Sequence, residues 1–155
     1  MVSGGWKARY ELATLWISID TDTGRPRRLT DQFLDVYGPA TRGRKVSARQ
    51  RISRPTAELI DTGERLDWTP RWTDIDPFKH MNNVVYWSAL QHALGTDPPP
   101  SARLLVEHGA GVEPDHHTEA VIERWDDGLR MWWLTDTADG HLSDQYLAAA
   151  EMVVP

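Results

Sequence analysis

One amphipathic helix followed only by strand-like segments is the feature that most restricts how this chain can fold. Apolar residues recur at three- and four-residue spacing between Asn83 and Leu94, and this period predicts a helix. The apolar positions are Val84, Tyr86, Trp87, Leu90 and Leu94. Gly95 ends the helix and Pro98–Pro100 prevent it from restarting. Asn82 or Asn83 is the expected N-cap, whose side chain accepts from an unpaired amide of the first turn.

The segments around this helix are predicted to be extended. An extended segment from Leu66 to Trp72 precedes it, and four strand-like runs follow it: Arg103–Val112, Glu119–Trp125, Leu129–Thr135 and Gln145–Val154. Two hairpin signals separate the last three runs, Asp126-Asp127-Gly128 and Ala138-Asp139-Gly140. A helix among antiparallel strands must bury its apolar stripe against one sheet face, so the sequence predicts an α+β layer. The core is expected to contain Trp125, Trp132 and Trp133.

The first part of the chain has a different character. Residues Arg9 to Asp20 alternate apolar and polar side chains, which predicts a strand, and Asp22-Thr23-Gly24 predicts a turn after it. Residues 37–45 combine Tyr37-Gly38-Pro39 with a charged run and predict a loop. We therefore expect three regions: residues 1–37 as a terminal strand and tail, 38–62 as a basic linker, and 63–155 as the main domain.

Composition excludes several classes of protein. The chain has 155 residues, of which 40% are hydrophobic and 26% charged, as expected for one globular domain. The absence of cysteine excludes disulfides, thiolate metal sites and a cysteine nucleophile. No run of 18 apolar residues and no secretory signal is present, so we expect a cytoplasmic protein without a membrane span.

Charge is distributed unevenly along the chain. Residues 1–60 carry 11 basic and 6 acidic side chains, whereas residues 61–155 carry 6 basic and 17 acidic ones. The basic run from Arg42 to Arg54 lacks interleaved aromatic residues, so a solvated linker is favoured over a nucleic-acid site.

The position of Asp76 ahead of the helix start suggests chemistry. Unpaired amides in a first helical turn carry positive potential and can hold a thioester carbonyl oxygen as negative charge develops on it. A carboxylate beside them can attack the carbonyl or activate water. Capping and turn formation by the Asp and Asn residues is the structural alternative.

Residues 71–86, RWTDIDPFKHMNNVVY, resemble the active-site segment of hotdog thioesterases. That segment reads Asp-x-Asp, a short loop, His-Val-Asn-Asn, two residues and Tyr. The stretch is most similar to acyl-ACP thioesterases, and its Asp-x-Asp-Pro start is similar to the 4-hydroxybenzoyl-CoA thioesterase group. The resemblance implies a hotdog fold over residues 64–154, in which an antiparallel sheet wraps around one central helix.

The resemblance also implies roles for individual residues. Asp76 would be the catalytic carboxylate, His80 would assist it or orient substrate and water, and Asn83 would offer its backbone amide to the carbonyl. Asn82, which shapes the loop, is an expected substrate-binding residue. Phe78 and Tyr86 complete the expected substrate-binding set.

The implied activity is hydrolysis of acyl-ACP or acyl-CoA thioesters to a free fatty acid and a thiol carrier, without metal or cofactor. Leu15–Asp20 and Thr23–Pro26 resemble the end of the first hotdog in double-hotdog acyl-ACP thioesterases. A single complete hotdog leaves a sheet edge open, so a homodimer is expected. The basic run would then be able to contact acidic acyl carrier protein or the phosphates of coenzyme A.

Two departures from the family favour an alternative, a noncatalytic hotdog that binds acyl groups or acts as a scaffold. Acyl-ACP thioesterases carry an Asn where this chain has Phe78. They also carry a Glu after the helix, whose place falls near Gly111 or Glu113.

Two further patterns are not expected to be functional. The Asp-Thr-Gly triplets at 22–24 and 61–63 are ordinary turns rather than an aspartic protease pair. The cluster His108, Asp115, His116, His117 and Glu119 is a surface turn rather than a metal site.

Overall fold

The fold is described here from a computed structural model of the chain. The structure describes residues 9, 11–15, 17–44, 47, 49–68, 70–95, 99, 101–114, 117–137 and 140–155. The chain forms two compact units, Met1–Arg49 and Gln50–Pro155. Several residues used in the sequence-based predictions lie outside the described ones: Tyr10, Trp16, Lys45, Pro98, Pro100, Asp115, His116, Ala138 and Asp139.

The first unit contains a short hairpin. Its strands β1 (Ser18–Ile19) and β2 (Pro26–Arg27) pair antiparallel. The Asp20 carboxylate closes the predicted turn by accepting from the backbone amides of Asp22 and Thr23, at 3.2 and 2.9 Å. The long strand predicted from Arg9 to Asp20 is wrong, since β1 alone forms there among the described residues. Alternation of apolar and polar residues was not enough, because a strand needs a hydrogen-bonded neighbour, and among the described residues only β2 supplies one.

A helix replaces much of the loop predicted at residues 37–45. Helix α1 spans Asp31–Thr41, and Thr30 caps it by accepting from the amide of Phe33 at 3.2 Å. Pro39 lies in the last turn, where its missing N–H costs only one helical hydrogen bond. Arg42 ends the helix in the left-handed conformation, with φ of 51°. The loop prediction gave too much weight to Gly38 and Pro39 and none to the cap at Thr30.

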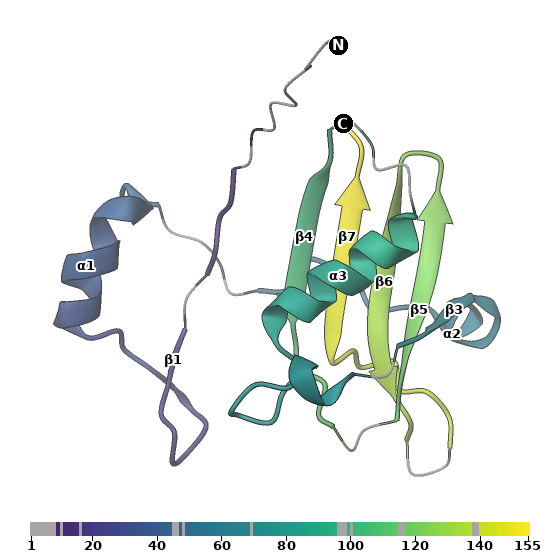
Figure 1. Cartoon of the computed structure of the whole chain (residues 1–155), viewed down its shortest axis with the longest axis horizontal. Coiled ribbons are helices and arrows are strands. Elements are labelled where there is room, and N and C mark those ends of the chain that lie inside the picture. Colours follow the sequence, from purple (N-terminus) through teal and green to yellow (C-terminus); the bar gives the residue numbers. More distant parts are fainter. Residues whose placement is uncertain are drawn as a thin grey trace, which may run out of the picture. The chain divides into compact units, whose positions relative to one another are not determined.

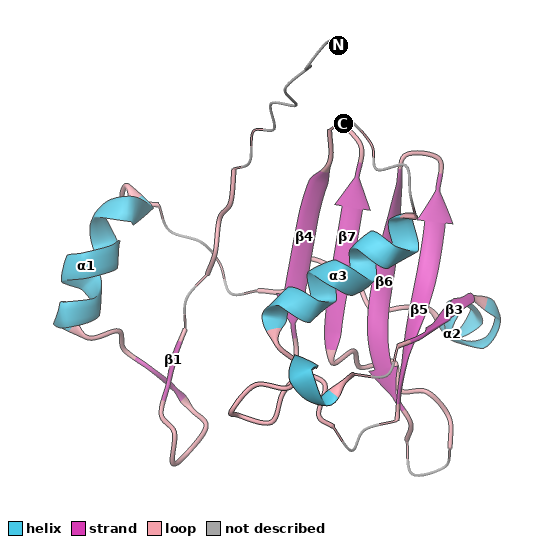
Figure 2. Cartoon of the chain, in the orientation of Figure 1, coloured by secondary structure: helices cyan, strands magenta, loops and turns pink. Residues whose placement is uncertain are grey.

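The second unit is a five-stranded antiparallel sheet with helices on its faces (Figures 1 and 2). Its strands are β3 (Glu64–Asp67), β4 (Arg103–His108), β5 (Thr118–Trp125), β6 (Gly128–Thr135) and β7 (Ala148–Val153). The order across the sheet is β3-β5-β6-β7-β4, so β3 and β4 are the edge strands. The predicted meander is confirmed for β5, β6 and β7, including the tight turn at Asp126-Asp127, which joins the paired residues Trp125 and Gly128. It is wrong for the first run, because β4 pairs with β7 at the far edge rather than with β5.

Two predicted extended segments are shorter than expected. The first ends as β3 at Asp67, and Trp72 begins a short 3-10 helix, η1 (Trp72–Asp74). The second, predicted from Arg103 to Val112, ends as β4 at His108 because Gly109 and the residues after it leave the ladder.

Helix α3 (Asn83–Leu94) crosses one face of the sheet (Figure 1). Its start lies beside β4, where Tyr86 contacts the ring of His108, and its end lies over β5, where the Ala93 carbonyl accepts from Arg124. Its buried residues are Val85, Tyr86, Ala89 and Leu90. The predicted stripe is therefore partly wrong, since Val84 and Trp87 are 67% and 39% exposed. Ala89, whose side chain is small, faces the sheet in their place.

Both faces of the sheet are covered by apolar groups. On the α3 face, Met131 and Trp133 pack with Tyr86 and Leu90. On the opposite face, Trp132 packs with Ile52 and Ile60. Neighbouring strand residues point to opposite faces, so the predicted core residues Trp132 and Trp133 are both buried but in separate clusters. Trp125 is only half-buried, with the Arg130 guanidinium over its ring.

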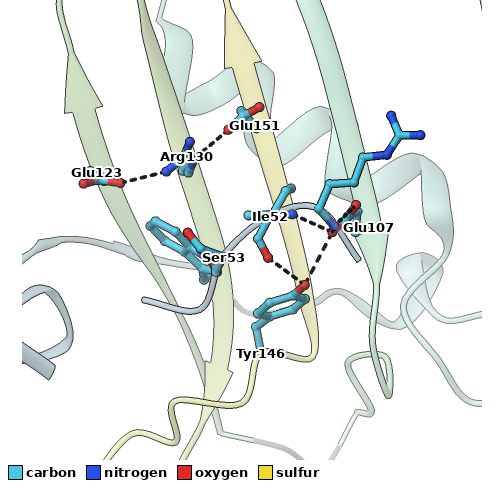
Figure 3. Close-up of polar contacts among 9 residues, drawn as sticks. Ile52, Ser53, Glu107, Glu123, Arg130, Tyr146 and Glu151 are labelled. Atoms are coloured by element: carbon cyan, nitrogen blue, oxygen red, sulfur yellow. Dashed lines mark hydrogen bonds and ion pairs between the residues drawn. The ribbon is translucent and has the colours of Figure 1, made fainter. Parts of the chain in front are cut away.

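Residues 50–62 cover the second face of the sheet, although part of a linker was predicted there. The Glu107 carboxylate accepts from the backbone amides of Arg51 and Ile52 at 2.8 and 3.0 Å (Figure 3). The Tyr146 hydroxyl lies 3.2 Å from the Ile52 carbonyl. Helix α2 (Ala57–Thr62) follows and buries Ile60. This clasp, residues 50–53 with Glu107 and Tyr146, joins the segment to β4 and to the residues that precede β7.

In the part of the chain that the structure describes, no helix has the length and apolar content needed to cross a membrane.

The clasp predicts a loss of stability at high pH. Burial, followed by the negative charge of Glu107, raises the pKa of Tyr146 to about 12. In the unfolded chain a tyrosine ionises near pH 10, so ionisation favours unfolding above that pH. Tyr146 therefore stabilises the fold fully below about pH 10, and we expect that stability to be lost as the pH rises toward 12.

Urea unfolding at about pH 9 and about pH 11 tests this prediction against Tyr146→Phe, which has no group to ionise. The free energy of unfolding should fall more in the wild-type protein than in the variant. Equal falls in the two proteins would contradict the role given to Tyr146.

Candidate active site

The predicted site lies in a tight hairpin between η1 and α3. The Asp76 amide donates to the His80 carbonyl at 2.8 Å, and the Asn82 amide donates to the Asp74 carbonyl at 2.7 Å. The Lys79 amide donates back to the Asp76 carbonyl at 3.0 Å, which closes a turn across Pro77 and Phe78. The sequence favours this turn because Pro77 pre-sets its own backbone angle and Asp76 accepts from amides further along.

The Asp76 carboxylate is held by the hairpin that it begins. Its Oδ1 atom accepts from the backbone amides of Phe78 and His80, at 2.8 and 3.1 Å. No other described residue donates to the carboxylate, so Oδ2 has no hydrogen bond from this part of the chain. Asp76 is half-buried. One oxygen therefore fixes the orientation of the group, and the other is available for chemistry.

The first carboxylate of the Asp-x-Asp motif is a structural anchor. Asp74 is buried, and both its carboxylate oxygens accept from the Arg71 guanidinium, at 3.0 and 2.9 Å. Hydrogen bonding from Arg71 lowers the pKa of Asp74 below its usual range. The Arg71 amide also donates to Asp74, which completes the cap of η1. Arg71 and Asp74 thereby fix the start of the hairpin that presents Asp76.

A second segment, Gly111–Glu113, meets the hairpin beside His80. The Met81 amide donates to the Val112 carbonyl at 2.7 Å. The Glu113 Oε1 atom lies 3.9 Å from Nε2 of His80. Gly111 has φ of +87°, and a Cβ built on it would lie 3.2 Å from Cδ2 of His80. The imidazole is thus bordered by a glycine and by a carboxylate from the segment that follows β4.

The family glutamate was expected near Gly111 or Glu113, and of these two residues Glu113 places a carboxylate oxygen 3.9 Å from Nε2 of His80. Gly111 was not identified as a site residue, although Gly109 and Gly111 after a strand are a signal of close backbone approach. The sequence could not reveal which residue faces the imidazole, because residues 80 and 113 are joined only by the tertiary fold.

The start of α3 offers one unpaired amide to the same region. Asn82 is the N-cap, and its side chain accepts from the Val84 amide at 3.1 Å, which decides between the two predicted caps. The Val85 amide donates to the Asn82 carbonyl at 2.8 Å. Within the described residues, the Asn83 amide donates to no acceptor. That amide is therefore available to bind an oxygen at the positive end of the helix.

The remaining two predicted residues lie in opposite environments. Phe78 is 72% exposed at the tip of the hairpin. Tyr86 is almost completely buried, and its hydroxyl accepts from the Val112 amide at 3.2 Å. Burial raises the pKa of the Tyr86 hydroxyl, and the negative charge of Asp76 adds to the rise. Phe78 can contact a ligand directly, whereas Tyr86 contacts the segment that borders His80.

Together these groups form a surface suited to acyl transfer. Residues 76–83 and 111–113 supply an oriented carboxylate, an imidazole with a second carboxylate 3.9 Å away, and a free helix amide. Such a set can activate water or attack a carbonyl, and it can stabilise the oxyanion that results.

Two described histidines outside this site, His117 and His108, have other partners. Nδ1 of His117 lies 3.0 Å from Oδ2 of Asp136, and Glu119 pairs with Arg65. His108 packs against the Tyr86 ring, and burial lowers its pKa. A hollow of about 1090 Å³ lies near His117, between α2 and the loop that precedes β7, and none of its lining residues belongs to the predicted site.

Comparisons with known proteins give a family match within the second unit. Residues 57–125 match the family described as acyl-ACP thioesterase C-terminal domain. Two uncharacterized proteins from two strains of Mycobacterium tuberculosis are each 30% identical over 132 residues. The matched region covers 84% of this chain and 51% of each relative, so the chain spans about half the length of the curated relatives it matches.

A solved structure shows the fold. The chain is similar to the 12:0-ACP thioesterase from Umbellularia californica, with a TM-score of 0.58 and 17% sequence identity. The similarity covers 87% of this chain and 52% of that protein. The mixed antiparallel fold is the hotdog fold that the sequence resemblance implied.

The contact between Gly111 and His80 predicts that Gly111→Ala displaces the imidazole. The new methyl group would press on His80, and the positive φ would cost about 1–2 kcal/mol of stability. The matched control is Gly140→Ala, which has φ of +76° and open space around the new methyl group.

Both variants should lose similar stability in thermal unfolding. Only Gly111→Ala should move the NMR signals of the His80 ring at a fixed pH. The packing described here would be contradicted if those signals stayed in place or moved equally in both variants.

Proposed function

We propose that the protein hydrolyses acyl thioesters, because residues 57–125 match the family described as acyl-ACP thioesterase C-terminal domain. The substrate is an acyl group on acyl carrier protein or on coenzyme A, and the products are a free fatty acid and the thiol carrier. The reaction uses no metal or cofactor and takes place in the cytoplasm. The observation that carries the proposal is the Asp76 carboxylate, which is oriented by two amides through one oxygen and left open at the other.

Asp76 supplies the negative charge that starts the reaction. As a general base it takes a proton from water while the water oxygen attacks the thioester carbonyl carbon. As a nucleophile it attacks that carbon directly, and water then hydrolyses the acyl-enzyme. In both routes the carbon–sulfur bond breaks, and the leaving sulfur receives a proton.

His80 and Asn83 act on the other atoms of the thioester. The Asn83 amide at the start of α3 donates to the carbonyl oxygen as it becomes negative. His80 orients water or substrate, and the Glu113 carboxylate 3.9 Å from Nε2 supports its imidazole. The Asn82 side chain holds the loop by capping α3.

An exposed phenyl ring beside a carboxylate favours an apolar substrate. Phe78 donates its amide to Asp76, and its ring is 72% exposed. We assign the ring to the acyl chain, which it would shield from water. The basic residues around Arg51 and Arg54 are assigned to the carrier, either an acidic carrier protein or the phosphates of coenzyme A.

The second candidate function is a hotdog that binds acyl groups without cleaving them. The observation that favours it is Phe78, since the family has an Asn at that position. The presence of Glu113 beside His80 favours catalysis, because a binding module has no use for a paired imidazole and carboxylate.

Asp76→Asn should abolish turnover while leaving the fold intact. The side-chain amide of the new Asn keeps the shape of Asp76 and an oxygen that accepts from Phe78 and His80. It cannot act as a base or a nucleophile, so the rate should fall roughly a hundredfold or more. A panel of acyl-CoA and acyl-ACP substrates measures the effect and also identifies the carrier. His80→Ala should lower the rate less than Asp76→Asn does. Wild-type turnover by Asp76→Asn would exclude the mechanism, and a wild-type protein that binds but cleaves none of the panel would favour the binding module.

Phe78→Ala should raise KM for long acyl chains and leave KM for acetyl-CoA nearly unchanged. Loss of a phenyl contact with an apolar chain costs about 1–2 kcal/mol, which is roughly a tenfold rise in KM. Trp72→Ala is the matched control, since Trp72 is an exposed aromatic residue that lies before the hairpin. A rise that does not depend on chain length would contradict the role of Phe78.

We also propose that the protein is a homodimer. β3 and β4 are the edge strands of the sheet, and an edge strand presents a row of backbone groups that can pair with another chain. Light scattering at micromolar concentration should therefore give twice the chain mass of 17.6 kDa. A stable monomer that is active would rule out the dimer.

A further inference from the structure

Tyr86 is held rigidly where α3 begins. It lies three residues after Asn83, and only 1% of its surface is exposed. Its ring meets the rings of His108 and Trp133 edge to face, each with centroids 5.0 Å apart. These contacts come from β4 and β6, so the sheet determines the position of the hydroxyl group.

The hydroxyl group contacts the segment that borders His80. Oη of Tyr86 accepts from the Val112 amide at 3.2 Å, and the Val112 carbonyl accepts from the Met81 amide at 2.7 Å. Val112 is completely buried and is thus held from both sides. Its neighbours are the two residues that border the imidazole, Gly111 by packing and Glu113 by its carboxylate.

We propose that Tyr86 is a positioning residue whose hydroxyl holds the segment Gly111–Glu113 against the His80 imidazole. The inference rests on the proposed thioesterase function and changes the role of Tyr86 from substrate contact to support of the site. The Val112 amide has no other acceptor among the described residues. Removing the hydroxyl leaves this buried N–H unsatisfied, so the segment should move to find water or another acceptor.

Tyr86→Phe tests the proposal because it keeps the ring contacts and removes only the acceptor. Tyr146→Phe is the matched control, since it also removes a buried hydroxyl, but one that bonds to Ile52 and Glu107 on the opposite sheet face. Both are made in the full chain. The measurements are the free energy of unfolding, the NMR signals of the His80 ring at a fixed pH, and kcat and KM for dodecanoyl-CoA.

Tyr86→Phe should shift the His80 ring signals and lower kcat about tenfold, with little change in KM. Tyr146→Phe should lose stability without either effect. The proposal is overturned if the two variants lose stability alike and neither moves the His80 signals, because Tyr86 would then be only a core residue.

Two further measurements distinguish failure of this proposal from failure of the proposed function and from misfolding of a variant. If wild-type protein does not cleave the thioester, the proposed function fails, while the His80 signals still decide whether Tyr86 holds the segment. Amide hydrogen exchange in wild-type protein needs no variant. The Val112 amide should exchange as slowly as the amides of α3, and exchange at the rate of exposed loop amides would overturn the hydrogen bond on which the proposal depends.

Discussion

The packing of α3 across the sheet is the constraint on which the rest of the second unit depends. The strands before and after the helix, β3 and β4, lie at opposite edges, so the connection between them has to cross the sheet. Burial of Tyr86, Ala89 and Leu90 fixes that crossing. The start of α3 is thereby held beside β4, and the hairpin before it meets the segment that leaves β4. The candidate site exists because these two segments are joined through Met81 and Val112.

Hydrogen bonds that involve a backbone amide, rather than pairs between side chains, hold most of the site in place. Asp76 is oriented by amides, His80 is tied through its own carbonyl and amide, and Val112 is held at both its N–H and its C=O. A backbone N–H donor is present at every residue except proline, whatever side chain the residue carries. Phe78 can therefore replace the family's Asn without disturbing the hairpin, because only its amide contributes to the turn.

The second face of the sheet shows how a segment of linker-like composition can become part of a fold. Residues 50–62 contain Arg51 and Arg54 and few apolar groups, yet Ile52 and Ile60 are enough to cover Trp132. The Glu107 carboxylate accepts the amides of that segment, which offsets the cost of withdrawing them from water. One acidic side chain of β4 thus holds this segment through its backbone amides.

The sequence by itself determined the helix from Asn83 to Leu94, the hairpin turn at Asp126-Asp127, the strand-like runs after the prolines and the motif around Asp76. These features depend on local period and turn chemistry, which are visible in short windows. The tertiary structure alone decided that Ala89, rather than Val84 and Trp87, faces the sheet, that residues 50–62 cover its second face, and that Glu113 lies beside His80. Such outcomes depend on contacts between residues distant in sequence, whose partners no local pattern specifies. The early strand failed because pairing with another strand decides it, whereas the loop at 37–45 failed because the local cap at Thr30 was overlooked.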